Sequence, residues 1–84
     1  MDSRVVILPL AQVDFEKLSH AISARVAAAL LDLRDFPVHR TGIKKLKLPF
    51  QGYRKRVGNY RILFDFDNAV IVIQRIINRK DAYR

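Results

Sequence analysis

Residues Gln51–Phe64 read QGYRKRVGNYRILF and carry the clearest structural signal in the chain. Apolar and charged residues alternate on both sides of Gly58-Asn59, which is the pattern of two β-strands. A two-residue connection with glycine first is typical of a tight hairpin turn. The stretch therefore predicts a β-hairpin, and placing Gly58-Asn59 at the turn fixes which residues face each other.

The predicted register divides the hairpin into two faces. Val57 faces Tyr60 beside the turn, and Arg56 then faces Arg61. Directly opposed residues share a face, and faces alternate along each strand. The more apolar face suits packing against helices and holds Tyr53, Lys55, Val57, Tyr60, Ile62, Phe64 and Phe66. The other face, which we expect to be open, holds Arg54, Arg56, Arg61, Leu63 and Asp65.

The open face brings like charges together. Opposed like charges destabilise a strand pair by some tenths of a kcal/mol, up to about 1, and Arg56 against Arg61 is such a pair. Local conflicts of this kind tend to mark functional positions. Guanidinium groups are forked donors suited to phosphate oxygens, and Asp65 alone cannot neutralise three of them. We therefore expect an anion-binding site here; neutralisation by Asp65 and other acidic residues is the alternative.

The remaining sequence predicts two helices and two further strands. Pro37 ends the helical region because proline cannot continue a helix, and Ser19-His20 is a suitable break or cap. The expected elements are a strand at Arg4–Leu8, helices at Leu10–Ser19 and Ala21–Leu33, a loop at Val38–Pro49, strands at Gly52–Val57, Tyr60–Phe66 and Val70–Ile77, and a turn at Asp67-Asn68. Residues 1–84 thus form one α+β domain, β-α-α-β-β-β, with two helices on one face of a mainly antiparallel four-stranded sheet.

Positive charge is concentrated in the second half of the chain. The 84 residues carry a formal charge of +8, but residues 1–43 hold five basic and five acidic residues. The excess therefore lies in residues 44–84, which hold eleven basic and three acidic residues. A segregated basic half predicts a surface for nucleic acid or an acidic protein; a role in solubility alone is the alternative.

The composition predicts a cytoplasmic protein with no membrane partner. The chain has no cysteine, so it forms no disulfide or thiolate metal site, which fits a reducing compartment. No apolar run approaches the roughly 20 residues that span a bilayer. The apolar run near the N-terminus is short, and Asp14 and Glu16 follow at once, unlike the pattern of a signal peptide.

The last predicted strand turns basic towards its end. Residues 70–84 read VIVIQRIINRKDAYR, apolar before Gln74 and then rich in arginine and lysine. In an antiparallel sheet, the end of this strand lies beside the start of the strand that carries Arg61. Arg79 and Tyr83 can therefore reach the same open face.

These residues resemble the RelE/ParE superfamily of toxins from type II toxin–antitoxin pairs, and specifically its RelE-like branch. The resemblance covers residues 44–84, with KLKLPFQGYRKRVGNYRILFDF and RIINRKDAYR as the matching stretches. It implies a metal-independent, cofactor-free endoribonuclease (an mRNA interferase) that inhibits translation by cleaving mRNA at the ribosome. In that reaction the substrate 2′-hydroxyl attacks the adjacent phosphate and leaves a 2′,3′-cyclic phosphate.

The resemblance also implies roles for individual residues. Arg54 and Arg56 match basic residues of the first hairpin strand, Arg61 an arginine that stabilises the charged transition state, Arg79 a basic residue near the leaving group, and Tyr83 a tyrosine that stacks on or orients a base. Further basic residues are expected to bind mRNA or ribosomal RNA: Lys44, Lys45, Lys47, Arg75, Lys80 and Arg84. The expected protein partner is an acidic antitoxin that folds on binding.

The sequence departs from the family pattern in its proton-transfer groups. Arginine stays protonated, so neither Arg54 nor Arg56 is a general base, and Asn78 stands where many members have histidine. His20 and His39 are far from these residues in the sequence and lie in a predicted helix or loop. Two alternatives therefore remain beside the nuclease: a ParE-like toxin that inhibits DNA gyrase, and a basic binding module that is catalytically weak or inactive.

Overall fold

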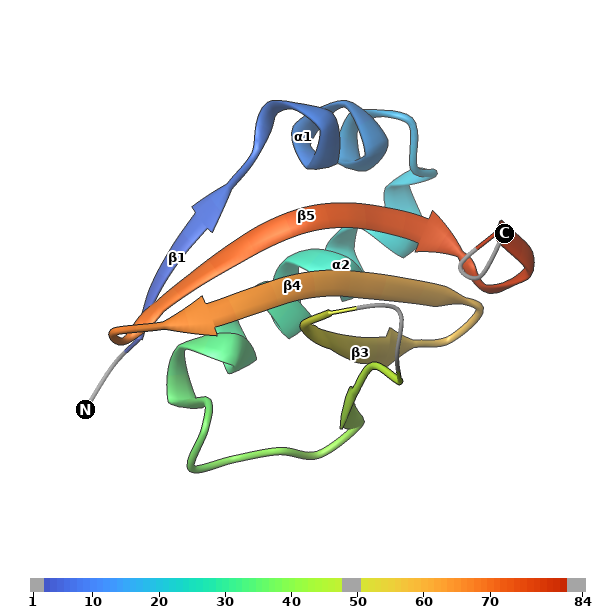
Figure 1. Cartoon of the computed structure of the whole chain (residues 1–84). Helices are drawn as coiled ribbons and strands as arrows, with labels where there is room; N and C mark the ends of the chain where they lie inside the picture. The colour runs from blue at the N-terminus through green and yellow to red at the C-terminus, as the bar shows by residue number, and fades with distance from the viewer. Residues whose placement is uncertain (1–2, 48–50, 82–84) are drawn as a thin grey trace.

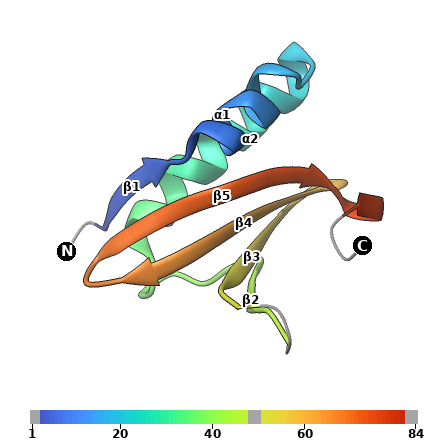
Figure 2. The same cartoon turned by 45° about the horizontal axis from the view of Figure 1, so that its top comes forward.

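Two helices cover one face of a five-stranded sheet. The computed structural model of the chain describes residues 3–47 and 51–81, and its sheet has the order β1-β5-β4-β3-β2 (Figure 1). The elements are β1 Arg4–Ile7, α1 Pro9–Glu16, α2 His20–Asp32, β2 Ile43–Lys45, β3 Tyr53–Val57, β4 Tyr60–Asp67 and β5 Val70–Asn78, with short 3-10 helices η1 Leu33–Asp35 and η2 Arg79–Asp81. Both helices lie on the same side of the sheet (Figure 2), so the predicted α+β class is confirmed.

The predicted number of strands is wrong by one. β2 lies inside the predicted loop Val38–Pro49 and pairs antiparallel with β3, which makes it an edge strand of the sheet. β2 is only three residues long, and two of them are exposed lysines, so its own sequence shows no strand pattern. At the other edge β1 pairs in parallel with β5, whereas all other pairings are antiparallel.

The predicted hairpin register is confirmed residue by residue. Val57 pairs with Tyr60, Arg56 with Arg61 and Tyr53 with Phe64. Gly58 has a φ of +56°, a backbone conformation that glycine adopts without the steric penalty of a Cβ atom. The turn at the other end of β4 is one residue later than predicted, because Asn68 and Ala69 are the residues with positive φ.

The core lies between the helices and the apolar face of the sheet. Ser19 caps α2 by accepting a hydrogen bond from the Ile22 N–H, and Phe36 follows η1 in extended conformation before Pro37. The Phe36 ring makes edge contacts with three aromatic rings of the hairpin, at centroid distances of 5.1 Å to Tyr53, 5.4 Å to Phe64 and 5.0 Å to Phe66. No helix in residues 3–47 or 51–81 is long and apolar enough to cross a membrane.

A bulge in β5 decides which side chains reach each face. Leu63 pairs with Arg75 and Phe64 with Ile73, so Gln74 is an extra residue in β5. A bulge changes the alternation of side chains along its strand. It allows Ile73 and Ile76 both to be buried in the core, while Arg75 shares the open face with its cross-strand partner Leu63.

Gly52 marks a close approach between the start of β3 and β4. Its φ is +95°, and a Cβ atom there would lie 2.7 Å from the Phe64 carbonyl oxygen and 2.5 Å from the Asp65 Oδ1 atom. The backbone oxygen cannot move away without disturbing the β3–β4 pairing. Gly52 is therefore required by both conformation and space.

Replacing Gly52 with alanine should destabilise the fold strongly. We expect Gly52→Ala to lower the free energy of unfolding by about 2 to 4 kcal/mol, combining left-handed backbone strain with overpacking. Gly42→Ala is the matched control, because Gly42 also has a positive φ but its nearest non-neighbour atom would be 3.7 Å from the new Cβ. The control should lose only about 1 to 2 kcal/mol. Urea unfolding measures both, and equal losses would contradict the steric argument.

Candidate RNA-binding site

The open face of the sheet carries a cluster of cationic side chains from β2 and β3. Lys44 pairs with Arg54 across β2 and β3, and Arg56 follows Arg54 on the same face. Together with Gly42 and Ile43, these three side chains line a shallow hollow of about 190 Å³. β2 thus adds a second pair of opposed cations, Lys44 and Arg54, to the predicted pair of Arg56 and Arg61.

Arg61 is placed differently from the expectation of an open guanidinium. Arg61 is only 6% exposed. The prediction that its guanidinium is exposed beside Arg54 and Arg56 is therefore wrong. Its Nη1 donates to the carbonyl oxygens of Gly58 at 3.2 Å and Tyr60 at 2.9 Å. The side chain therefore bends back towards the β3–β4 turn, and its positive charge lies beneath the surface at that end of the sheet.

Asp65 forms no ion pair with Arg54 or Arg56 in the described parts of the chain. Its Oδ2 accepts a hydrogen bond from the amide of Gln74, the extra residue of the β5 bulge. The ion pair between Asp14 and Arg75 includes neither Arg54 nor Arg56. The charge on the β2–β3 cluster is thus left for solvent or a ligand.

Arg79 lies at the same end of the sheet as Arg61, as predicted. The Arg79 N–H donates to the Asn59 carbonyl oxygen at 2.6 Å, which holds η2 against the β3–β4 turn. The Arg79 side chain is exposed. Tyr83 and Arg84, both predicted site residues, lie outside the described residues.

The other predicted RNA-binding lysines are spread over several surfaces. Lys45 pairs with Tyr53 and so belongs to the opposite face from Lys44. Lys47 follows β2 and Lys80 lies on η2, and all three are exposed. Lys55, which the register assigned to the helix side, donates to the Thr41 carbonyl oxygen at 3.1 Å.

No histidine joins the cationic cluster. His20 begins α2, and His39 lines a separate hollow of about 260 Å³ with Asp32, Asp35 and Lys55. Within residues 3–47 and 51–81, no group of three or more histidines and carboxylates is arranged to hold a metal ion. Among the described residues, the site consists of lysine and arginine side chains and contains no histidine.

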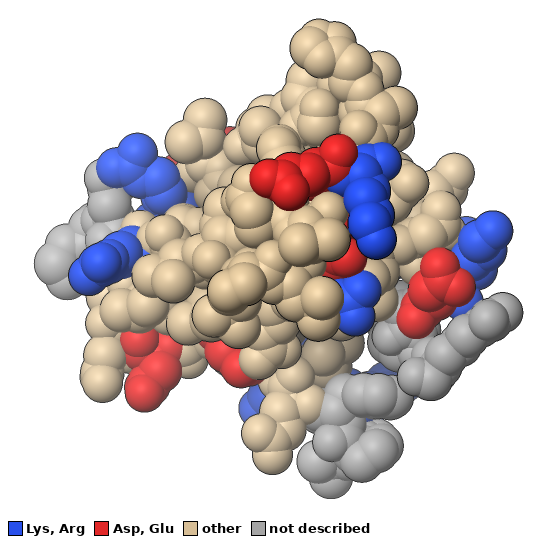
Figure 3. Space-filling model, turned by 90° about the horizontal axis from the view of Figure 1, so that it is seen from above, with Lys and Arg blue, Asp and Glu red and all other residues tan. Residues whose placement is uncertain are grey.

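The helix side of the molecule looks different from this cluster. Seen from above in the orientation of Figure 1, the surface is mostly neutral, and its charged side chains stand in separate groups (Figure 3). Among the described residues of the helices, Leu10 and Val13 of α1 and Leu31 of α2 are exposed large apolar side chains. The face drawn in Figure 3 therefore differs from the β2–β3 cluster, where three cations line one hollow.

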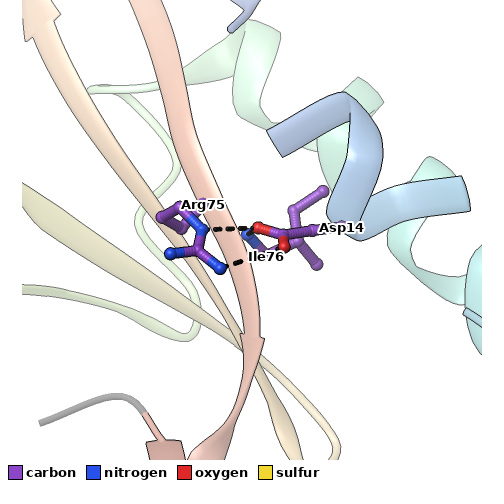
Figure 4. A network of polar contacts seen from close by, with 3 residues as sticks. All are labelled: Asp14, Arg75 and Ile76. Carbon is purple, nitrogen blue, oxygen red and sulfur yellow. Dashed lines mark hydrogen bonds and ion pairs between the residues drawn. The ribbon is translucent and has the colours of Figure 1, made fainter. Parts of the chain in front are cut away.

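Arg75 is held by Asp14, a contact that the sequence did not reveal. The Asp14 carboxylate accepts from Arg75 Nε at 2.7 Å, from Arg75 Nη2 at 3.1 Å and from the Ile76 N–H at 3.0 Å (Figure 4). β1 pairs with β5 only as far as Ile73, so Asp14 satisfies a backbone donor on the edge that β1 leaves uncovered. Arg75 therefore fastens α1 to β5 and is less available to RNA than predicted.

The electrostatics of Asp14 follow from these contacts. Burial raises the pKa of the Asp14 carboxyl, but the hydrogen bonds from Arg75 and the Ile76 N–H, with the attraction of the Arg75 charge, outweigh burial. The pKa of Asp14 consequently lies below its ordinary value of 3.8. The carboxylate is thus ionised over the whole physiological range.

The fold and the basic hairpin together define a toxin family. A family model described as the ParE toxin of the type II toxin–antitoxin system parDE matches residues 5–83, and the chain belongs to this family. Toxin RelE3 of Methanocaldococcus jannaschii is 44% identical over 41 residues, which span 49% of this chain and 47% of that protein. The match thus covers about half the length of this curated relative.

Solved structures support the same assignment. A chain of the toxin–antitoxin complex RelBE2 from Mycobacterium tuberculosis superposes with a TM-score of 0.82 at 29% identity, covering 96% of this chain and 95% of that one. A chain of the archaeal RelE–RelB complex from Pyrococcus horikoshii OT3 gives a TM-score of 0.78 at 27% identity, covering 98% and 100%. The predicted membership of the RelE/ParE superfamily is therefore confirmed.

Removing the charge of Asp14 should weaken the attachment of α1 to β5. We expect Asp14→Asn to lower the free energy of unfolding by about 1 kcal/mol at neutral pH, a modest value because the Arg75 side chain is 41% exposed. Since the folded pKa is depressed, the contribution of Asp14 is complete above its unfolded pKa and is lost as pH falls through the folded pKa. The variant should therefore lose less stability than the parent on acidification.

Glu16→Gln is the matched control for this prediction. It removes the same charge from the same helix, but Glu16 is exposed and accepts only from the Gln12 amide at 3.3 Å. Urea unfolding at about pH 7 and about pH 3 compares the two variants. Equal stability losses at neutral pH would show that the Asp14 contacts contribute nothing beyond net charge.

Proposed function

We propose that this chain is a RelE-like toxin that cleaves mRNA at the ribosome and so inhibits translation in the cytoplasm. The observation that carries the proposal is the hollow lined by Lys44, Arg54 and Arg56, in which Lys44 and Arg54 are directly opposed. These cations lie together although mutual repulsion disfavours it, and a phosphodiester supplies the compensating negative charge. The match to Toxin RelE3 over half of the chain favours the RelE branch.

The arginines suit a reaction that depends on charge stabilisation. The substrate 2′-oxygen attacks the adjacent phosphorus, the bond from phosphorus to the 5′-oxygen breaks, and the products are a 2′,3′-cyclic phosphate and a 5′-hydroxyl. The 2′-hydroxyl proton is released, and the departing 5′-oxygen gains a proton. Cations aimed at the phosphoryl oxygens lower the barrier as negative charge develops.

Each arginine has a distinct part in this proposal. Arg61 stabilises the charged transition state from beneath the surface, where the turn carbonyls hold its guanidinium. Arg54 and Arg56 bind phosphate oxygens from the open face, with Lys44 beside them in the hollow. Arg79 acts near the leaving oxygen, and Tyr83 orients a base. Because no arginine accepts the 2′-proton, we expect water or a group of the substrate complex to do so.

The antitoxin partner forms part of the same proposal. The similar chain from Mycobacterium tuberculosis comes from a toxin–antitoxin complex, and the one from Pyrococcus horikoshii comes from a RelE–RelB complex. An unneutralised cationic face attracts an acidic chain segment that orders as it binds. We therefore expect this chain to be inhibited by an acidic antitoxin that covers the open face.

A ParE-like action on DNA gyrase is the second candidate. The matching family model carries the ParE description, and the described residues of the site include no general base. Such a toxin would block supercoiling and leave mRNA intact. The two candidates therefore differ in the molecule that is damaged when the toxin is produced.

Induction of the protein in a growing bacterium tests both candidates. We expect growth arrest, mRNA cut in the presence of ribosomes but not with naked RNA, and rescue by co-expression of an acidic antitoxin. Arg79→Ala should reduce cleavage by about 100- to 1,000-fold, the usual effect of losing one transition-state donor. Primer extension measures the cuts, and thermal melting checks that the variant folds.

The control variant is Arg4→Ala, because Arg4 is also exposed but pairs with Val70 at the far end of β5. Its cleavage should equal that of the parent. Growth arrest with intact mRNA and blocked supercoiling would reject the nuclease in favour of the gyrase inhibitor. Full cleavage by Arg79→Ala would reject the assignment of Arg79 alone.

A further inference from the structure

Arg25 of α2 lies against the β3–β4 turn, although it comes from the neutral half of the chain. A Cβ atom at Gly58 would lie 3.1 Å from both the Nη1 and Nη2 atoms of Arg25 and 3.4 Å from its Cζ. Gly58 has no such atom, so the guanidinium rests directly on the turn. The glycine therefore serves two purposes, a positive φ and a seat for Arg25.

The same two-residue turn contacts cationic residues from two other elements. Arg61 of β4 donates to the Gly58 carbonyl oxygen, and the backbone N–H of Arg79 donates to the Asn59 carbonyl oxygen. Arg56 precedes the turn in β3. Arg61 comes from the sheet and is buried, whereas Arg25 comes from the helix layer and is exposed, so cationic residues approach the turn from both layers.

Arg25 retains donors for a ligand. The residue is exposed, and in residues 3–47 and 51–81 no ion pair to Arg25 is present. A guanidinium offers five N–H donors. Asp81 lies in the neighbouring hollow with Tyr60 and Asn78 and is not in ion-pair contact with Arg25. Arg25 therefore places an exposed positive charge at the turn on the side of the helix layer.

We propose that Arg25 binds an RNA phosphate, so that the bound RNA backbone passes from the open face around the β3–β4 turn to the helix layer. This inference rests on the proposed RNA-directed function and adds a contact outside the hairpin and the chain end. The ligand chemistry is a phosphodiester oxygen, which either mRNA or ribosomal RNA supplies. An acidic protein segment is the competing occupant.

The salt dependence of RNA binding by purified protein tests the proposal. The affinities for a short single-stranded RNA and for vacant ribosomes are measured over a range of salt concentrations. The parent is compared with three variants, Arg25→Ala, Arg25→Lys and Arg4→Ala. Alanine suits a helix interior, so Arg25→Ala should fold, as a thermal melt will confirm. We expect its affinity to fall about three- to tenfold and its salt slope to drop by about 0.7, the value of one single-strand phosphate contact. Arg25→Lys should keep the slope, and Arg4→Ala should match the parent.

Each outcome decides the proposal. A loss on the oligonucleotide identifies an mRNA phosphate, and a loss confined to ribosomes identifies ribosomal RNA; both support the contact. Parental binding of both RNAs by Arg25→Ala overturns it, as does an equal loss in Arg4→Ala. If parental protein cleaves mRNA while Arg25→Ala binds normally, only this inference fails. If parental protein neither binds nor cleaves RNA, the proposed function fails and the inference with it.

Discussion

The positive φ of Gly58 is the constraint on which the arrangement of this protein depends. It closes the β3–β4 hairpin in one register, and that register assigns every following residue to a face. A slip of one residue would exchange the faces, burying Arg56 and exposing Phe64. Because Phe64, Ile62 and Val57 are needed in the core, the core holds the cations on the opposite face. Packing energy on one side of the sheet thus maintains electrostatic repulsion on the other.

Two secondary features adapt this hairpin to the rest of the fold. The bulge at Gln74 lets β5 bury its isoleucines and still turn Gln74 and Arg75 away from the core. Each of these polar residues then meets a carboxylate, Asp65 or Asp14. These carboxylates are thereby occupied away from the cluster of Lys44, Arg54 and Arg56. The fold therefore separates cations with structural partners from cations that face solvent.

The hairpin could be predicted from the sequence because its signals are local. Glycine at a two-residue turn and alternation on either side determine the register without tertiary information. β2 could not be predicted, since three residues become a strand only by pairing with β3. The burial of Arg61 depends on a side-chain conformation that alternation does not specify. Asp14 and Arg75 are 61 residues apart in sequence, and no local pattern links α1 to the end of β5.

Arg25 is a candidate site residue that no local pattern in the sequence identifies. Arg25 lies in an alanine-rich helix of the neutral half, so neither charge segregation nor resemblance to the toxin family singled it out. Its position follows from the packing of α2 over the sheet and from the missing Cβ of Gly58. The basic half of the chain therefore gives an incomplete account of the basic surface. A residue's neighbours in space decide its role more than the charge of its segment.

The central claim is that the opposed cations Lys44 and Arg54 are maintained for a polyanion at the expense of stability. The most direct test is urea unfolding of Arg54→Thr and the parent, each with and without a short single-stranded RNA. The account predicts that the variant is more stable without RNA, by some tenths of a kcal/mol up to about 1, and gains less stability when RNA is added. A variant that is less stable without RNA, or that gains as much from RNA as the parent, would contradict it.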